Sequence, residues 1–192
     1  MLFMTPEAKR KTSHWFILLV PFFYIFFLSR EMILLILAIV MSIVIVFELL
    51  RLKNEKLNQK LLKFFDGVYR ETEAKNVSTL IFTLSGIFFT VFFFEKEIAL
   101  LAIFFLTFGD GFAALVGEKY GKHKIFGKKS WVGVITNLLT CLAVGLIFSH
   151  FYPIKFSQIF FGSLAATVIE ILPVKDNLLI PVVSAYVMTL ML

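Results

Sequence analysis

Residues 97–117 read EIALLAIFFLTFGDGFAALVG, an apolar run that begins at Glu97 and contains one further carboxylate, Asp110, between two glycines. About 20 apolar residues are enough for a helix to cross the roughly 30 Å hydrocarbon core of a bilayer. Comparable runs recur along the chain, which is 59% hydrophobic and 17% charged. Soluble domains are roughly 45–50% apolar and about a quarter charged. The composition therefore predicts an all-α, polytopic integral membrane protein.

The apolar runs predict about seven transmembrane helices. We place them at residues 14–29, 31–50, 77–94, 97–117, 131–152, 156–173 and 178–192, within one domain that covers residues 1–192. The opening stretch MLFMTPEAKRKTSH has no A-x-A-like cleavage site, so we expect the first run to stay as a helix. The polar segment 51–76 mixes leucines with lysines, which predicts either an amphipathic helix on the membrane surface or a solvated connector.

Basic residues set the expected orientation of these helices. When alternate loops are assigned to the cytoplasm, most of the 19 lysines and arginines lie on that side. The positive-inside rule then places the N-terminus in the cytoplasm. The net charge of +6 therefore belongs to one face of the protein. Topology and attraction to anionic lipid headgroups explain that charge, and no nucleic-acid partner is expected.

This topology brings polar residues from distant parts of the sequence to the cytoplasmic ends of the helices. They are His14, Glu48, Asp110, Asn137, Glu170, Asp176 and Asn177. A charge at the bilayer centre costs roughly 2.5–3.5 kcal/mol on insertion scales, so such residues usually face a cavity and have a function there. The alternative is that they lie in water at the interface. That alternative suits Glu48, close to Arg51, better than it suits Asp110 between its glycines.

A lysine-rich loop, residues 118–130, follows Asp110 in the sequence. Carboxylates and lysines at one membrane face suit a magnesium–polyphosphate complex, because Mg²⁺ takes one or two carboxylates together with phosphate oxygens and lysines neutralise the phosphates. Gly109 and Gly111 leave room beside Asp110 for another helix or a ligand. The segment GKHKIFGKKS is no P-loop, because its glycines are spaced one residue too far apart and Lys129 stands where Ser or Thr should follow the Gly-Lys pair.

Several segments resemble, in order, the motifs of the CTP-dependent polyprenol and lipid kinases, the family of dolichol kinase, phytol kinase and yeast-type diacylglycerol kinase. They are EAKRKTSH (7–14), FELLR (47–51), GDGFAALVGEKYGKHKIFGKKSWVG (109–133) and VIEILPVKDNLLIP (168–181). The resemblance covers nearly the whole chain. It implies transfer of a phosphoryl group from a nucleoside triphosphate, usually CTP, to the hydroxyl of a membrane lipid alcohol, with the active site on the cytoplasmic face.

The resemblance and the chemistry together suggest roles for individual residues. Asp110 is expected to bind Mg²⁺, with Glu170 or Asp176 as a second carboxylate. The nucleotide phosphates are expected to contact Lys128 and Lys129, helped by Lys122 or Lys124, the Gly127 backbone, the Ser130 hydroxyl and Asn177. The general base for the lipid hydroxyl is open among His14, Glu170 and Asp110.

Two other functions are weighed against the kinase. A phosphatidate cytidylyltransferase, which makes a CDP-activated lipid, also uses Mg²⁺ and CTP. Its long C-terminal signature is reduced here to the Lys175-Asp176 pair. A non-enzymatic membrane transporter should place polar groups near the bilayer midplane, often in paired repeats. The sequence shows no internal repeat, and its polar groups gather at one face.

Overall fold

A computed structural model describes residues 15–64, 71–127 and 129–192 of the chain. Its α-helices are α2 (Leu19–Phe26), α3 (Arg30–Lys53), α4 (Glu55–Phe64), α5 (Thr79–Phe93), α6 (Lys96–Phe104), α7 (Gly111–Tyr120), α8 (Trp131–Phe148), α9 (Phe156–Ile171) and α10 (Asp176–Leu190). Short 3-10 turns at Trp15–Leu18 and Glu71–Ala74 precede α2 and α5, and a π-helical segment joins α6 to α7. The predicted helical fold class is confirmed.

Each apolar run predicted to span a membrane contains helix. By length and composition, three helices of the described chain are long and apolar enough to cross a membrane, namely Arg30–Lys53, Lys96–Tyr120 and Trp131–Phe148. The other apolar helices are shorter. Seven spans and a cytoplasmic N-terminus therefore stay predictions.

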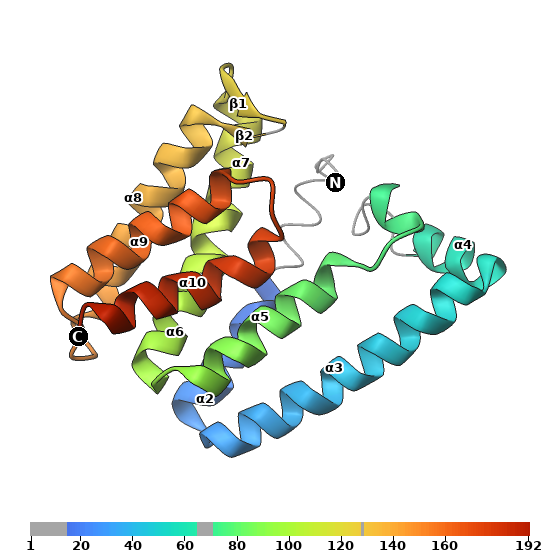
Figure 1. Cartoon of the computed structure of the whole chain (residues 1–192), viewed down its shortest axis with the longest axis horizontal. Coiled ribbons are helices and arrows are strands. Elements are labelled where there is room, and N and C mark those ends of the chain that lie inside the picture. Colours follow the sequence, from blue (N-terminus) through green and yellow to red (C-terminus); the bar gives the residue numbers. More distant parts are fainter. Residues whose placement is uncertain (1–14, 65–70, 128) are drawn as a thin grey trace, which may run out of the picture.

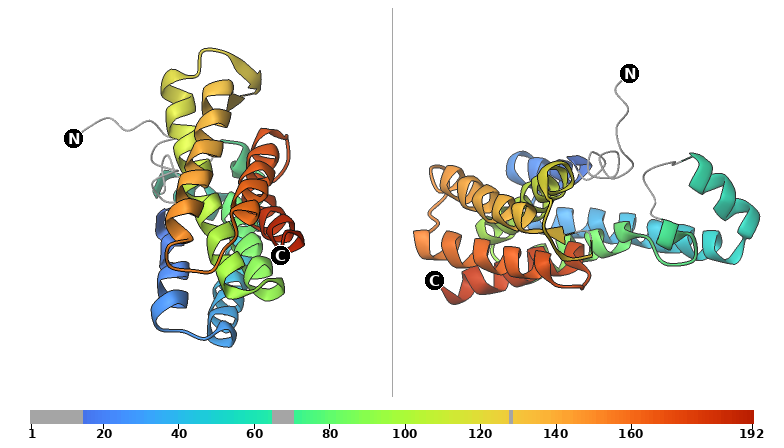
Figure 2. Two further views of the ribbon diagram at one scale, coloured as in Figure 1. Left: turned by 90° about the vertical axis from the view of Figure 1, so that its left-hand side faces the viewer. Right: turned by 90° about the horizontal axis from the view of Figure 1, so that it is seen from above.

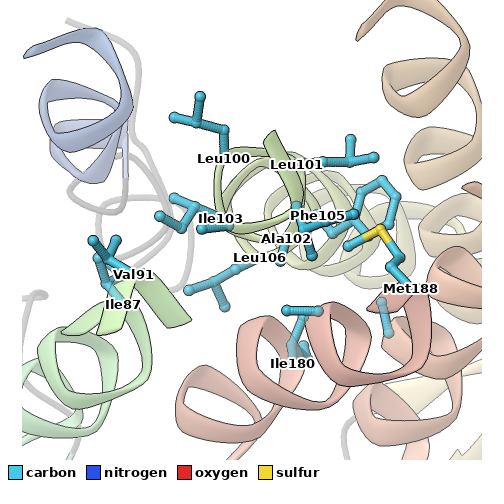
Figure 3. Close-up of a cluster of buried hydrophobic side chains, with 14 of the residues drawn as sticks. Ile87, Val91, Leu100, Leu101, Ala102, Ile103, Phe105, Leu106, Ile180 and Met188 are labelled. Carbon is cyan, nitrogen blue, oxygen red and sulfur yellow. The ribbon is translucent and has the colours of Figure 1, made fainter. Parts of the chain in front are cut away.

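The apolar run at residues 97–117 forms the centre of the molecule. The most apolar part of Lys96–Tyr120 is 72% buried inside the fold, against 17% for α3. Helices α5, α8, α9 and α10 pack around it, and α3 extends along α5 at the edge (Figures 1 and 2). Figure 3 shows α6 end-on, with its side chains between Ile87 of α5 and Met188 of α10. Because α6 is apolar on all its faces, it is suited to this central position.

One close approach of two helices depends on a glycine. A Cβ built at Gly86 of α5 would lie 2.7 Å from the backbone oxygen of Asn177 in α10. No real Cβ tolerates backbone at that distance, so only glycine lets the two helices meet here. This contact fixes the beginning of α10, which carries Asp176 and Asn177, against the middle of the helical body.

Helix α10 begins earlier than the predicted span 178–192. Asp176 and Asn177 were expected between two spans, but they form the first turn of α10. The reason is electrostatic, because a carboxylate is favourable beside the partial positive charge of a helix N-terminus. Both residues therefore have a fixed position at the start of α10.

A short β-hairpin interrupts the lysine-rich loop, and the sequence analysis did not predict it. Strand β1 (Lys124–Phe126) pairs antiparallel with β2 (Lys129–Ser130). Gly127 occupies the turn with a φ of 55°, a left-handed conformation that glycine adopts without steric cost. Gly127, whose backbone was expected to contact a phosphate, therefore lies in a tight turn.

The segment after α3 contains the helix predicted for residues 51–76, here α4. A buried ion pair anchors it: the Arg51 guanidinium donates to Glu48 at 2.7 and 3.2 Å, to Asn58 of α4 at 2.7 Å, and to two backbone carbonyls further along. Glu48 also accepts from the backbone N–H of Ser78. Glu48 and Arg51 thus do not lie in water at an interface. They clamp α3, α4 and the start of α5 together.

Candidate functional site

Asp110 is the last residue of a six-residue π-helical segment, Phe105–Asp110. The segment continues the buried helix α6 and leads directly into α7. Asp110 itself is only 4% exposed. Single π-turns within α-helices occur frequently at functional sites, because they redirect side chains that a regular helix would place elsewhere. The predicted central carboxylate therefore lies inside the fold, at an irregularity of the backbone.

The two glycines beside Asp110 have different surroundings. A Cβ at Gly109 would lie 2.6 Å from the Cys141 Sγ and 3.3 Å from the Asn137 Nδ2, both on α8. A Cβ at Gly111 would meet nothing within 4 Å. Gly109 is thus required for the approach of a helix, as the sequence suggested. Gly111 borders open space.

Lys129 brings together residues from three parts of the chain. Its Nζ lies 3.2 Å from Oδ2 of Asp176 and 3.9 Å from Oε1 of Glu170, and it also donates to the Glu170 backbone carbonyl. Lys129 comes from the hairpin, Glu170 from the end of α9 and Asp176 from the start of α10. The predicted convergence of these three residues is present in the structure. We call them the Lys129 cluster.

Asn177 lies beside this cluster and is 3% exposed. Its backbone N–H donates to the Asp176 carboxylate at 3.0 Å. Its side-chain Nδ2 has no hydrogen-bond partner among the described residues. A buried amide nitrogen in this position is an available donor for a ligand oxygen.

Ser130 has a structural contact that the sequence did not suggest. It is the N-cap of α8, where its hydroxyl accepts from the Gly133 N–H at 3.2 Å and donates to the Gly117 carbonyl at 3.4 Å. A Cβ at Gly121 would lie 2.1 Å from the same hydroxyl oxygen. Ser130 therefore packs closely against Gly117 and Gly121, and these contacts join the end of α7 to the start of α8.

The remaining predicted site residues are more peripheral or lie outside the described chain. Lys122 and Lys124 are exposed, and Gly127 is exposed in the hairpin turn. His14 and Lys128 fall outside the described residues. Their predicted roles as general base and phosphate ligand stay predictions.

The donor set can be compared with what Mg²⁺ requires. Within the described ranges there is no group of three or more His, Cys, Asp or Glu residues that could hold a metal ion. Glu170 and Asp176 form a pair, since both contact one ammonium group. Mg²⁺ is commonly bound by one or two carboxylates plus substrate phosphates and water, so this pair fits a nucleotide-bound magnesium ion and not an all-protein metal cage.

A polar contact inside the helical body connects the Asp110 region to α9. The Thr167 hydroxyl donates to the Asn137 side-chain oxygen at 3.0 Å. Thr167 lies one helical turn before Glu170, and Asn137 lies against Gly109. Asn137 was expected at this face but was given no role. Its pairing with Thr167 has no signal in the sequence, because the two residues are 30 positions apart.

The fold and the site define an α-helical protein with helices long enough to cross a membrane and with a lysine–carboxylate cluster at one end of its helical body. No family model matches the chain, and no solved structure matches it either. The chain is 31% identical over 184 residues to an uncharacterized protein of Rickettsia prowazekii, covering 91% of this chain and 89% of that protein. It therefore belongs to the same family as that protein.

Two further relatives have names that state an activity. The chain is 29% identical over 136 residues to phytol kinase 1 of Arabidopsis thaliana, covering 63% of this chain and 44% of the kinase. It is 26% identical over 117 residues to CTP-dependent diacylglycerol kinase 1 of Saccharomyces cerevisiae, covering 58% of this chain and 39% of the kinase. The chain is thus a distant homologue of lipid kinases, and it spans less than half the length of these two.

Proposed function

We propose that this protein is a kinase that transfers a phosphoryl group from a nucleoside triphosphate, with CTP as the donor, to the hydroxyl of a membrane lipid alcohol. The observation that carries the proposal is the Lys129 cluster, which joins a lysine and two carboxylates from three distant segments. All three residues lie within two of the family-like motifs, 109–133 and 168–181, and the distant homology to phytol and diacylglycerol kinases supports the same reaction class.

The chain's own residues have distinct tasks in this reaction. Lys129 contacts the β- and γ-phosphates and stabilises the charge that develops during transfer, as lysines do in phosphoryl-transfer enzymes. Asn177 donates its Nδ2 to a phosphate oxygen. Asp110 holds the reacting groups in place from the buried side of the site. Lys128, with Lys122 or Lys124, adds positive charge that attracts the phosphates.

Magnesium would be held by Asp110 together with Glu170 or Asp176, and when bound it neutralises the phosphates and orients the γ-phosphate. The Lys129 ammonium lies between Glu170 and Asp176. An ammonium in that place balances the two negative charges. The lysine is then within reach of any phosphate that enters the cluster.

The lipid alcohol reaches the site from the hydrocarbon side. Helix α3 exposes apolar side chains along much of its length, which suits contact with acyl or isoprenoid chains. The hydroxyl lies at a membrane surface, because the nucleotide is water-soluble, and the topology predicted from the sequence makes that surface the cytoplasmic one. His14, Glu170 and Asp110 are the candidates for the general base, and a loose phosphoryl-transfer transition state needs little help from one.

The decisive experiment is a donor and acceptor panel with purified full-length protein. CTP and ATP labelled in the γ-phosphate are incubated with a polyprenol, phytol and diacylglycerol, and the lipid and nucleotide products are both identified. A labelled lipid phosphate together with CDP supports the kinase. A CDP-lipid together with pyrophosphate, from a reaction that includes phosphatidate, would identify a cytidylyltransferase instead. If no lipid product forms with any pair, the proposal is wrong.

A further inference from the structure

Asn137 is a fully buried polar residue in the middle of the helical body, with 0% exposure. Its side-chain Oδ1 accepts from the Thr167 hydroxyl at 3.0 Å and from the Cys141 thiol at 3.6 Å. Thr167 also donates to the Ser163 carbonyl at 2.8 Å, so its proton is shared. These contacts from two helices fix the orientation of the Asn137 amide.

The other end of that amide has no partner. Asn137 Nδ2 makes no hydrogen bond among the described residues, although it is buried. A buried donor without an acceptor costs free energy, and native proteins contain few of them. Such a group indicates either strain or a function in binding or catalysis.

The unpartnered nitrogen lies against Gly109, the residue before Asp110. A Cβ at Gly109 would lie 3.3 Å from that nitrogen. The Asp110 carboxyl interacts electrostatically with the thiol of Cys141, which is one turn further along the same face of α8. Because Thr167 and Cys141 both donate to the oxygen end of the amide, the nitrogen end is the one that faces Gly109.

We propose that Asn137 is a positioning residue for Asp110. In the substrate-loaded protein its Nδ2 donates a hydrogen bond to the Asp110 carboxylate and holds that carboxylate toward the bound ligand. A carboxylate accepts several hydrogen bonds at once, so the contact adds to the other interactions of Asp110. This inference rests on the proposed function, since it gives Asp110 a task within the kinase site.

Asn137 also connects two parts of that site. Through Thr167 it contacts α9 one turn before Glu170, and through its Nδ2 it reaches the Asp110 side of the site. The same amide therefore sets the position of Asp110 relative to the helix that ends in the Lys129 cluster.

The test compares Asn137→Leu with the unchanged full-length protein. Leucine has the branching of asparagine but no donor, and Thr167 keeps the Ser163 carbonyl as its acceptor. We expect a thermal midpoint at least as high as that of the unchanged protein, because an unsatisfied buried polar group is removed. We expect kcat to fall roughly 10- to 100-fold, the loss typical of a hydrogen bond to a charged group, with little change in the KM for nucleotide.

A second variant and a control keep the result interpretable if leucine disturbs packing. Asn137→Ala removes the same donor without adding volume, and it should show the same loss of kcat. Thr136→Val is the matched control, because the Thr136 hydroxyl bonds only to the carbonyl of its own helix at 2.8 Å among the contacts described. Its kcat and thermal midpoint should be unchanged.

Four outcomes of these measurements bear on the positioning role of Asn137. Loss of kcat with an unchanged or raised thermal midpoint supports the positioning role. Loss of kcat in proportion to a lowered midpoint in both variants indicates a merely structural asparagine and overturns the inference. Unchanged kcat in both variants, with Asp110→Asn inactive, also overturns it while leaving the proposed function in place. If Asp110→Asn is itself fully active, Asp110 has no role in catalysis, and the positioning role of Asn137 is overturned with it.

Discussion

The ammonium group of Lys129 lies 3.2 Å from the carboxylate of Asp176, a residue 47 positions away in the chain. The same ammonium contacts Glu170, at 3.9 Å from its carboxylate. Three chemically complementary groups thus meet where a hairpin, the end of α9 and the start of α10 come together. Each of the predictions below tests one contact of this arrangement or of the helical body that supports it.

Replacing Lys129 by methionine should lower kcat by roughly 100- to 1000-fold, because a preorganised group that stabilises transition-state charge is lost. Methionine keeps much of the side-chain length and removes only the charge. Steady-state kinetics with the lipid acceptor identified by the donor panel measure the effect. Lys119→Met, an exposed lysine at the end of α7, is the matched control and should retain full activity. Equal activity of the two variants would show that Lys129 has no role in catalysis.

Asp110→Asn should abolish kinase activity while the protein still inserts into membranes and folds. Asparagine has nearly the same shape, so packing at this 4% exposed position is kept while the negative charge is lost. A carboxylate is the preferred protein ligand of Mg²⁺, and an amide is a weaker one. Activity and the thermal midpoint should be measured on the same preparation. Wild-type turnover in a correctly folded variant contradicts the assignment.

The two glycines beside Asp110 should respond oppositely to alanine. Gly109→Ala places a methyl 2.6 Å from the Cys141 Sγ, which should destabilise the protein by about 1–3 kcal/mol, the usual cost of overpacking. Gly111→Ala meets no atom within 4 Å and gains helix propensity of up to about 1 kcal/mol. Thermal unfolding in detergent measures both changes. A destabilised Gly111→Ala variant would show that this space is not open.

A double variant tests the cause of the destabilisation expected for Gly109→Ala. Adding Cys141→Ala shrinks the side chain that the new methyl meets. The double variant should regain part of the lost stability, because the closest contact of the new methyl group is with that sulfur. If the double variant is simply additive, the close contact does not explain the effect of Gly109→Ala.

Arg51→Met should destabilise the protein by about 3–5 kcal/mol, because it leaves the Glu48 carboxylate buried without its guanidinium. The guanidinium has 0% exposure and donates to α4 and to the segment before α5, so the loss should also release α4. Chemical denaturation measures the first effect, and hydrogen exchange at residues 55–64 the second. Lys53→Met, an exposed cation two residues away, should change little.

A stability of Arg51→Met close to that of Lys53→Met would show that the buried ion pair contributes little. A double replacement of Glu48 and Arg51 by apolar residues should recover part of the loss, since buried pairs often tolerate replacement as a unit. That comparison separates the ion pair itself from the cost of an isolated buried charge.

The amino-acid sequence by itself determined the helices. Long apolar runs favour helix because every backbone polar group must be satisfied within the segment, and this is a local property that composition records. The run at 97–117 was predicted from its residues alone, whereas for 51–76 a helix was one of two alternatives. The hairpin was missed because strands of two or three residues are too short to show a period.

The candidate site was partly predictable. Charge distribution and motif resemblance selected Lys129, Glu170, Asp176 and Asp110, and the first three do meet. Sequence reasoning gave no role to Asn137 and underestimated the Glu48–Arg51 pair, because a charged residue near the end of an apolar run has the same pattern whether it is solvated or buried. His14 and Lys128 stay predictions of the sequence.

Only the tertiary structure decided which helix is central and which polar groups touch. The apolar runs have similar composition, yet Lys96–Tyr120 is enclosed and α3 is largely exposed. Glycine at position 86 lets α10 approach α5, and a capping serine at 130 fixes the hairpin on α8. These contacts join residues far apart in the chain. Their free energy depends on distances between helices, which no local pattern of residues specifies.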